Sequence, residues 1–315
     1  MILAQRLALP AAWLAVIVLF GVIEPDTFLT SANAQNILGS QAVLVILTMA
    51  LLFPLTAGEY DLSVASVLTL SSMAIAVLNV RHGWPIGLAI LVAVALGAVV
   101  GFVNGGLVVL LHADSLVTTL GTGTVISGVV LWISGSQTIG GVSPSLVDPV
   151  ITWKLLGLPL AFFYGLALCA AVWYVLDFTP TGRRLLFVGR GRSVARLSGV
   201  RVGRVRWGAF VASGALSAVA GVVYTGTTGG ADPSSGLTFL LPAFAAAFLG
   251  ATSIAPGRFN PWGSIVAVYF LVTGVTGLQL LGAASFVQQL FYGGALIVAV
   301  ALGRLFSRTG RTATD

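Results

Sequence analysis

The sequence has very little charge. Only 8% of its 315 residues are charged, whereas a soluble domain carries about 25%. Hydrophobic residues make up 57% of the chain, and the mean hydropathy is +1.04. No soluble fold can bury so much apolar surface. The composition therefore excludes a soluble protein and predicts a chain that lies in lipid.

Residues that carry chemistry are also scarce. The single cysteine, Cys169, allows no disulfide within the chain and no cysteine-based metal site. The two histidines, His82 and His112, stand apart at the ends of apolar segments. The only lysine, Lys154, is not part of a GxxxxGK[ST] motif, so the chain has no loop of its own to hold ATP phosphates. We therefore expect neither an enzyme nor a bound cofactor or metal.

What the chain does have is a series of long apolar runs. They are continuous, as in membrane helices, and lack the alternation of a membrane barrel. We predict an all-α, polytopic transmembrane bundle of about ten helices, forming a single domain over residues 1–315. The predicted helices cover 7–23, 41–57, 62–80, 85–104, 116–134, 157–177, 207–227, 239–255, 262–280 and 285–302.

Small residues recur inside these runs. The chain has 39 glycines, and Gly97, Gly101 and Gly105 form two overlapping GxxxG patterns. The segment 214–221 is similarly rich in small residues. Such residues let membrane helices approach closely, so we expect tight helix contacts there.

The positive charges are distributed unevenly and predict the orientation. Eight of the 15 basic residues fall in one loop, 178–206, and others lie near the two termini. Basic loops remain in the cytoplasm, and with ten spans the loop and both termini fall on that same side. Arg81 is the exception, since it falls outside. Because the arginines follow a membrane face, we do not expect nucleic-acid binding. The charges are Arg183, Arg184, Arg190, Arg192, Arg196, Arg201, Arg204 and Arg206 in the loop, Arg6 at the N-terminus, and Arg304, Arg308 and Arg311 in the C-terminal tail.

Within the basic loop, residues 193–199 (SVARLSG) predict a very short helix. Ser193 is the expected N-cap and Gly199 the expected stop. Val194 and Leu197 would then share one face. Two interpretations are open: a loop that sets topology and rests on anionic lipid, or a helix that inserts into a groove on a cytoplasmic partner.

A second unusual segment, residues 56–63 (TAGEYDLS), places two carboxylates between apolar runs. Charge in lipid is costly, so this segment predicts either a turn at the cytoplasmic face or a helix broken inside the protein. Gly58 would provide the bend. Asp61 would either cap the next helix or belong to a translocation path. For Glu59 we expect a polar contact with that path or with a neighbouring subunit.

Taken together, these segments resemble the ribose-type sugar permeases of bacterial ATP-binding-cassette (ABC) importers. Residues 185–200 (LLFVGRGRSVARLSGV) are similar to the family pattern YAIGGNPEAARLSGI, and GEYDLSV at 58–64 is similar to the family's GxxDLSVG. The resemblance covers about residues 27–302. Two departures are Gly191–Ser193 where the family has NPE, and Leu241–Pro242 where many members have Glu-Leu. Further similar runs are TLGT at 119–122, GSQTI at 135–139, GGADPSSG at 229–236, FLGAT at 248–252, GRFNPWG at 257–263 and GVTGLQLLG at 274–282.

The resemblance implies the permease subunit of an importer in the bacterial plasma membrane, translocating a ribose-like or other monosaccharide. It implies a second permease subunit, identical or related, two cytoplasmic ATP-binding subunits and an extracytoplasmic sugar-binding protein. The implied ATPase-coupling residues are Gly189, Arg192, Ala195, Arg196, Leu197, Ser198 and Gly199. The implied translocation path or broken-helix element contains Gly58, Glu59, Asp61, Ser63, Thr119 and Thr122.

An alternative is a secondary carrier for sugar or another solute. In that case Glu59 and Asp61 would carry protons across the membrane, and no ATPase would be needed. The sequence does not identify the sugar, and it leaves both a homodimer and a heterodimer open.

Overall fold

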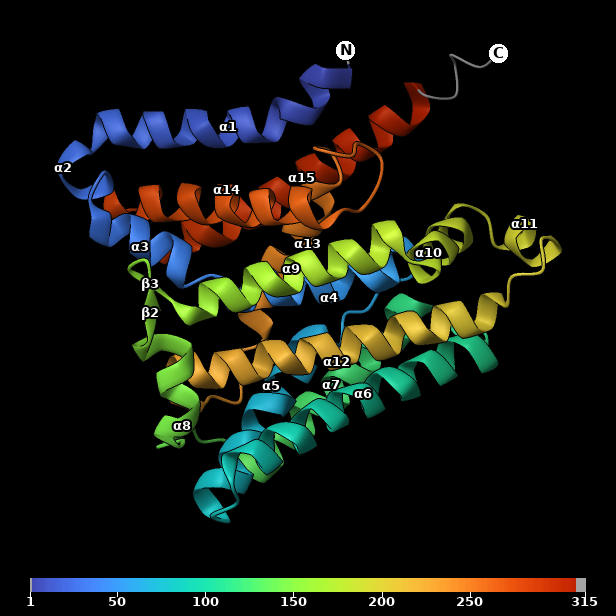
Figure 1. Cartoon of the computed structure of the whole chain (residues 1–315), viewed down its shortest axis with the longest axis horizontal. Helices are drawn as coiled ribbons and strands as arrows, with labels where there is room; N and C mark the ends of the chain where they lie inside the picture. The colour runs from blue at the N-terminus through green and yellow to red at the C-terminus, as the bar shows by residue number, and fades with distance from the viewer. Residues whose placement is uncertain (1, 310–315) are drawn as a thin grey trace.

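The structure, a computed structural model, describes residues 2–309 and the side chains of residues 5–301. Long helices run beside one another in the same general direction (Figure 1). The side chains of the basic tail at 304, 308 and 311 lie outside the described residues. The long helices are α1 (Ile2–Ile23), α4 (Ala42–Thr56), α5 (Val64–Ala76), α6 (Ile86–Leu110), α7 (Ser115–Ser134), α9 (Leu160–Phe178), α12 (Val202–Thr228), α13 (Leu237–Gly250), α14 (Pro261–Leu280) and α15 (Ser285–Thr309).

Shorter elements connect the long helices. Strand β1 pairs antiparallel with β4, and β2 pairs antiparallel with β3, each over two residues. The short elements are α2 (Pro25–Phe28), α3 (Ser31–Gly39), the π-helix η1 (Val77–Arg81), β1 (Ile139–Gly140), α8 (Pro144–Val147), the π-helix η2 (Asp148–Thr152), β2 (Lys154–Leu155), β3 (Leu158–Pro159), α10 (Pro180–Arg190), α11 (Arg192–Leu197) and β4 (Gly230–Ala231).

Each of the ten predicted segments is helical. Within the described part of the chain, eight helices are long and apolar enough to cross a membrane. Two of these are composite, because α3 continues into α4 and α5 continues into η1. The other two predicted segments correspond to shorter apolar helices, Leu237–Gly250 and Ser285–Ala301. The predicted all-α, polytopic fold is confirmed.

Helix α4 lies at the centre of the bundle. All its residues, from Ala42 to Thr56, are buried, and α4 contacts α5, α9, α12, α13 and α14. A helix that is apolar all round is expected to be surrounded either by lipid or by protein, and here the surroundings are protein. The charged segment that follows α4 is consequently sheltered from lipid by its neighbours.

Helices α6 and α12 pack through glycines. A Cβ atom placed on Gly101 would lie 2.2 Å from the carbonyl oxygen of Phe210, and one on Gly214 would lie 2.2 Å from the carbonyl oxygen of Gly97. No side chain fits into contacts this close, so the two backbones touch directly. The predicted role of these small residues in helix packing is confirmed.

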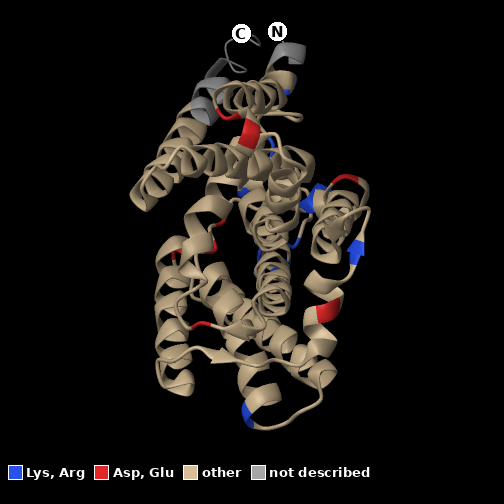
Figure 2. Ribbon diagram, turned by 90° about the vertical axis from the view of Figure 1, so that its left-hand side faces the viewer, with Lys and Arg blue, Asp and Glu red and all other residues tan. Residues whose placement is uncertain are grey.

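The two ends of the bundle differ in their elements. Helices α10 and α11, the start of α1 and the end of α15 lie at one end, and α2, α3, α8 and the β2–β3 pair lie at the other (Figure 1). The arginine-rich loop and both ends of the described chain therefore lie at the same end of the bundle. Seen along the helix axes, charged residues occupy few places on the ribbon (Figure 2).

Several details differ from the sequence predictions, among them the start of α12 at Val202 instead of 207 and the end of α13 at Gly250 instead of 255. Helix α6 continues to Leu110 instead of ending at 104. Helix α10 was not predicted, although Thr179 caps it and Pro180 occupies its first position, which is a recognised helix start. The prediction of Ser193 as N-cap was wrong, because Gly191 holds that position and its carbonyl accepts the N–H of Ala195 at 2.9 Å. Gly191 is the extended link after α10, so the helix must start there.

Candidate functional site

The site is built around the irregular junction between α4 and α5, residues 57–63. Helix α4 ends in a turn in which Gly58 has a φ of +75°, a conformation that glycine adopts without strain. The N–H of Gly58 donates to Leu55 at 3.1 Å, and the N–H of Glu59 donates to Pro54 at 2.9 Å. These bonds satisfy the last carbonyls of α4 and direct the chain away from the helix axis, as predicted for a bend at Gly58.

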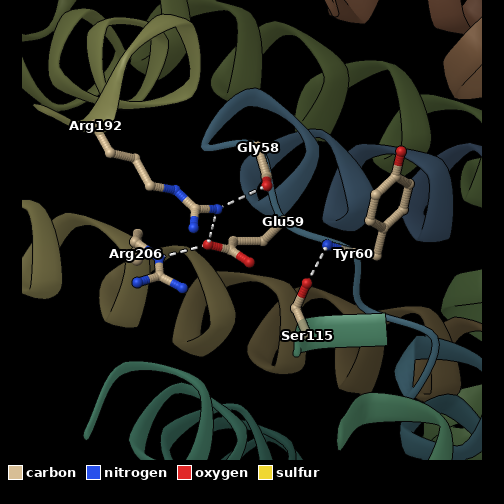
Figure 3. A network of polar contacts seen from close by, with 6 residues as sticks. All are labelled: Gly58, Glu59, Tyr60, Ser115, Arg192 and Arg206. Atoms are coloured by element: carbon tan, nitrogen blue, oxygen red, sulfur yellow. Dashed lines mark hydrogen bonds and ion pairs between the residues drawn. The ribbon is translucent and has the colours of Figure 1, made fainter. Parts of the chain in front are cut away.

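Glu59 is buried, with 3% of its side chain exposed, and two arginines neutralise it. Arg192 of α11 approaches its Oε1 atom at 2.5 Å, and Arg206 of α12 donates to the same oxygen. Arg192 also donates to the carbonyl oxygen of Gly58 at 3.0 Å (Figure 3). A buried carboxylate requires such partners. Glu59 thus ties the junction to α11 and α12 within the subunit.

Asp61, two residues further on, is 1% exposed and has a different environment. Its Oδ1 atom accepts the N–H of Ser63 at 3.1 Å and the hydroxyl of Ser63 at 2.6 Å. Its Oδ2 atom accepts the hydroxyl of Ser213, on α12, at 2.7 Å. The amide of Asn104, on α6, donates to the Ser63 hydroxyl at 2.9 Å. Among the described residues, no arginine, lysine or histidine pairs with Asp61.

The expected capping role of Asp61 is met only in part. The residue before α5 is Ser63, which makes no side-chain capping bond of its own. Asp61 lies two residues before it and accepts one backbone N–H, that of Ser63. The carboxylate therefore orders the approach to the helix and also reaches across to α12, which a local cap alone does not require.

The N-terminal part of α7 holds the junction from another side. The Ser115 hydroxyl accepts the N–H of Tyr60 at 3.2 Å (Figure 3), and the Thr119 hydroxyl accepts the N–H of Leu62 at 2.9 Å. Irregular backbone inside a membrane protein needs such partners. Thr119 is fully buried and occupied in this way, whereas Thr122 donates only to Thr118 of its own helix.

The basic loop is pressed against the same junction. A Cβ atom on Gly189 would lie 2.1 Å from the carbonyl oxygen of Thr56, so α10 passes the end of α4 in direct backbone contact. Only glycine permits this approach. Ala195 of α11 is buried against Val188 and Val202, which anchors one face of the short helix on α10 and α12.

The opposite face of α11 is open. Leu197 is 89% exposed and Val194 is 56% exposed, although both are apolar. Gly199 ends the helix with a φ of +80°, as predicted, and the N–H of Val200 returns to the carbonyl of Ala195 at 3.0 Å. Arg196 makes no ion pair among the described residues. The predicted shared face of Val194 and Leu197 therefore points away from the subunit.

Comparison with known proteins identifies the family to which this chain belongs. The model of the family described as "Branched-chain amino acid transport system / permease component" matches residues 33–300. The chain belongs to this permease family. The permease is 31% identical to the D-allose transport system permease protein of Escherichia coli K12, over 94% of this chain and 90% of the relative. It is 32% identical to the ribose import permease protein of Bacillus subtilis 168, over 91% and 89%.

A third relative shows a different named substrate. The autoinducer 2 import system permease protein of Salmonella typhimurium LT2 is 30% identical to the permease, over 96% of this chain and 92% of the relative. No solved structure matches the chain. These relatives confirm the resemblance to ribose-type importer permeases and support that interpretation over the proton-coupled carrier. The permease is a multi-pass protein of the bacterial inner membrane.

Several residues of the site were not singled out from the sequence. Arg206 was interpreted only as part of the basic loop, and Ser213 was not considered. Their partners Glu59 and Asp61 lie 147 and 152 positions away in the sequence. Asn104 was recognisable as an amide inside an apolar run, but its contact with Ser63 was not.

On the opposite end of the permease, the β1–β4 pair joins two loops. Thr138 donates to Asp232 at 2.8 Å, and the hydroxyl of Ser234 donates to the same carboxylate at 2.6 Å. The Ser234 hydroxyl, followed by the Ser234 N–H and the Thr138 hydroxyl, holds the pKa of Asp232 below its ordinary value. The loop after α7 and the loop after α12 are thereby fixed to each other.

Proposed function

We propose that this permease translocates a monosaccharide or a similarly small polar solute, driven by ATP hydrolysis on partner subunits. The proposed assembly has two permease subunits, two cytoplasmic ATP-binding subunits and an extracytoplasmic binding protein. Membership of the permease family supports this arrangement. Two of the named relatives, for D-allose and ribose, support a monosaccharide as the cargo.

We further propose that the chain is one domain with ten crossings and that the loop 178–206 and both termini are cytoplasmic. The positive-inside rule supports this orientation, because eight of the 15 basic residues fall in this one loop. Arg81, on the opposite face, donates to the carbonyl oxygens of Ile133 and Ser134 at 2.8 and 2.9 Å. Its charge is therefore used locally, at the C-terminal end of α7.

In this proposal α11 is the element that receives the ATPase. The observation that carries the proposal is that α11 has one exposed apolar face and one side in contact with the rest of the subunit. Its outer face exposes Leu197 and Val194, an apolar pair that a partner groove can bury. Its inner side connects to the α4–α5 junction through the Arg192–Glu59 pair, and the preceding helix α10 passes the end of α4 closely at Gly189. A displacement of α11 is thereby passed to the junction by direct contacts.

The residues of the junction serve, on this proposal, as a broken-helix element that responds to α11. Asp61, Ser63 and Thr119 are buried and bonded to the protein, so they hold the break in shape. Weak polar groups suit a transporter, because tight binding of the cargo would slow its release. The binding protein would then select the sugar.

The proposal is tested by purifying the chain from its native membrane and identifying co-purifying proteins by mass spectrometry. A partner with a phosphate-binding GxxxxGK[ST] loop, together with ATP-dependent uptake in proteoliposomes, is the expected result. Leu197→Arg should release that partner. The same substitution at Leu186 of α10 is not used as the control, because Leu186 is partly buried. Arg190→Gln, on the exposed part of α10, is the matched control. Uptake by the chain alone without ATP would overturn the proposal.

A further inference from the structure

A pocket beside the basic loop has not been given a role so far. It has a volume of about 620 Å³ and is formed by α10 and the first half of α12, with Phe53 of α4 contributing to its wall. Its volume is in the range of sites for small molecules. The pocket does not include Glu59, Asp61 or the exposed residues Val194 and Leu197.

One part of the pocket is strongly basic. Arg184, Arg201 and Arg204 line it, and no aspartate or glutamate does. Each of these arginines is exposed, and none takes part in the ion pairs formed among the described residues. The hydroxyl-bearing residues Thr181 and Ser198 also line the pocket. This donor set is suited to the oxygens of a phosphate group.

The other part of the pocket is apolar and extends along α12. The lining residues of α12 run from Arg204 at its first turn to Ala212, preceded by Arg201, and Leu185 and Phe53 face the same space. The nine helical residues from Arg204 to Ala212 rise roughly 13 Å. One leaflet of a hydrocarbon core is about half of 30 Å. The pocket therefore has a charged end and an apolar end separated by about the depth of a leaflet.

We propose that this pocket binds an anionic phospholipid, with the phosphate at the three arginines and an acyl chain along α12. A free phosphate group would satisfy the arginines but would leave the apolar part of the pocket uncovered. Basic pockets between membrane helices are known to suit anionic headgroups. Assignment to the cytoplasmic leaflet rests on the orientation proposed above, whereas binding itself does not depend on that orientation.

The position of the pocket links lipid to the coupling loop. Arg184 is on α10, Ser198 ends α11, and Arg204 begins α12, so one headgroup would contact all three elements. A bound lipid would hold the loop against the bundle through residues that take no part in the Arg192–Glu59 pair. The ligand class is therefore a phosphodiester lipid with net negative charge, such as phosphatidylglycerol.

The proposal is tested with the full-length permease in detergent and a fluorescent short-chain phosphatidylglycerol, using fluorescence anisotropy. Phosphatidylcholine with the same chains measures binding that does not depend on net charge. We expect at least tenfold tighter binding of phosphatidylglycerol. Arg184→Gln and Arg204→Gln should each weaken it about fivefold, since a basic residue near an anionic headgroup contributes about this much. Arg183→Gln is the matched control, because Arg183 is the adjacent arginine on α10 and does not line the pocket.

Two further measurements separate a lipid from a free phosphate. Ala212→Phe fills the apolar part and should weaken lipid binding while leaving the arginines in place. Inorganic phosphate at millimolar concentration should not displace the lipid. Arg184→Lys, which keeps the charge, should retain most of the binding and shows that the Gln variants act through charge. All variants are first compared by thermal unfolding to confirm that they are folded.

Three results would overturn the proposal. Equal affinity for phosphatidylcholine would show that charge is not recognised. An equal loss on Arg183→Gln would show that the loop attracts anions without a defined site. Displacement by inorganic phosphate, with no effect of Ala212→Phe, would assign the pocket to a soluble phosphate instead. Because binding is measured without an ATPase or a sugar, these results are independent of the transport proposal.

Discussion

Glu59 and Asp61 are two residues apart, both buried, and stabilised in opposite ways. Glu59 is neutralised by arginines from α11 and α12. Asp61 accepts the hydroxyls of Ser63, just before α5, and of Ser213 on α12, and it has no cationic partner among the described residues. One carboxylate is therefore connected to the exposed short helix, and the other is connected to the packed interior.

Glu59 and Asp61 therefore have different mechanical roles, although both lie in the junction of residues 57–63. Asp61 is bonded to Ser213 of α12, a helix that packs against α6 in direct backbone contact at glycines. The contacts of Glu59 include Arg192, whose side chain is 46% exposed and sits on a helix with an open outer face. We infer that the Glu59 side of the junction moves during transport while the Asp61 side keeps its arrangement.

The largest expected effect is on the Asp61 side. Asp61→Leu removes the acceptor of two hydroxyls and one N–H, and each unsatisfied buried donor costs about 1–3 kcal/mol. We expect the amount of folded permease in the membrane to fall at least tenfold. Asp61→Asn keeps an acceptor oxygen and should retain most of the protein. Equal membrane levels and equal uptake for both variants would contradict the role given to Asp61.

The second effect tests the buried half of the Glu59 contact. The side chain of Arg206 is 13% exposed, so Arg206→Gln leaves a buried carboxylate with only one partner. Breaking a buried pair costs about 3 kcal/mol, measurable as a lower unfolding temperature in detergent. The double variant Glu59→Gln with Arg206→Gln should be less destabilised than the sum of the single variants. Strict additivity of the two would show that these side chains do not interact.

The third effect concerns transport and leaves folding intact. Arg196→Glu reverses a charge on α11 that forms no ion pair among the described residues, so the level of permease should not change. Uptake should fall by about tenfold or more, because a like charge in an interface strongly disfavours the wrong pairing. ATP hydrolysis and sugar uptake are measured together in proteoliposomes. Unchanged uptake would count against docking at α11.

The smallest overall effect is expected for Arg192→Gln, which should act on the coupling of ATP hydrolysis to transport more than on stability. An ion pair with a half-exposed partner contributes less than about 1 kcal/mol, so unfolding should change little. The number of sugars moved per ATP should nevertheless drop, because α11 loses its charged link to the junction. Arg190→Gln is the control, because Arg190 is also exposed and forms no ion pair within the described part of the chain. If both variants lowered the ratio equally, total loop charge would be the cause.

Much of the fold could be predicted because the membrane simplifies it. Continuous apolar runs identify helices directly, and all ten predicted segments proved helical. The close packing at Gly101 and Gly214 was also foreseeable, since small residues at such spacing have one common purpose in membrane proteins. The boundaries were less predictable, as the extension of α6 to Leu110 illustrates, because apolar residues continue past the end of the predicted core.

The partners within the site could not be predicted. A sequence shows that Glu59 and Asp61 need compensation, but eight arginines in the basic loop are equivalent until the fold brings two of them to Glu59. Likewise, Ser213 is one of many hydroxyls inside apolar helices. Side-chain pairing across more than 100 residues depends on helix rotation and depth, and an apolar pattern that runs all round a helix leaves the rotation undetermined.

The pairing of Arg81 with the last carbonyls of α7 bears on how such a chain is inserted as it is made. On the proposed topology, this arginine is translocated against the usual charge preference. Its hydrogen-bond partners lie at the end of α7, which is synthesised later, because Arg81 and Ser134 are 53 positions apart. Until α7 emerges, the α5–α6 hairpin carries an unmatched cation, so biogenesis of this permease should be sensitive to the order in which the first five helices leave the translocon.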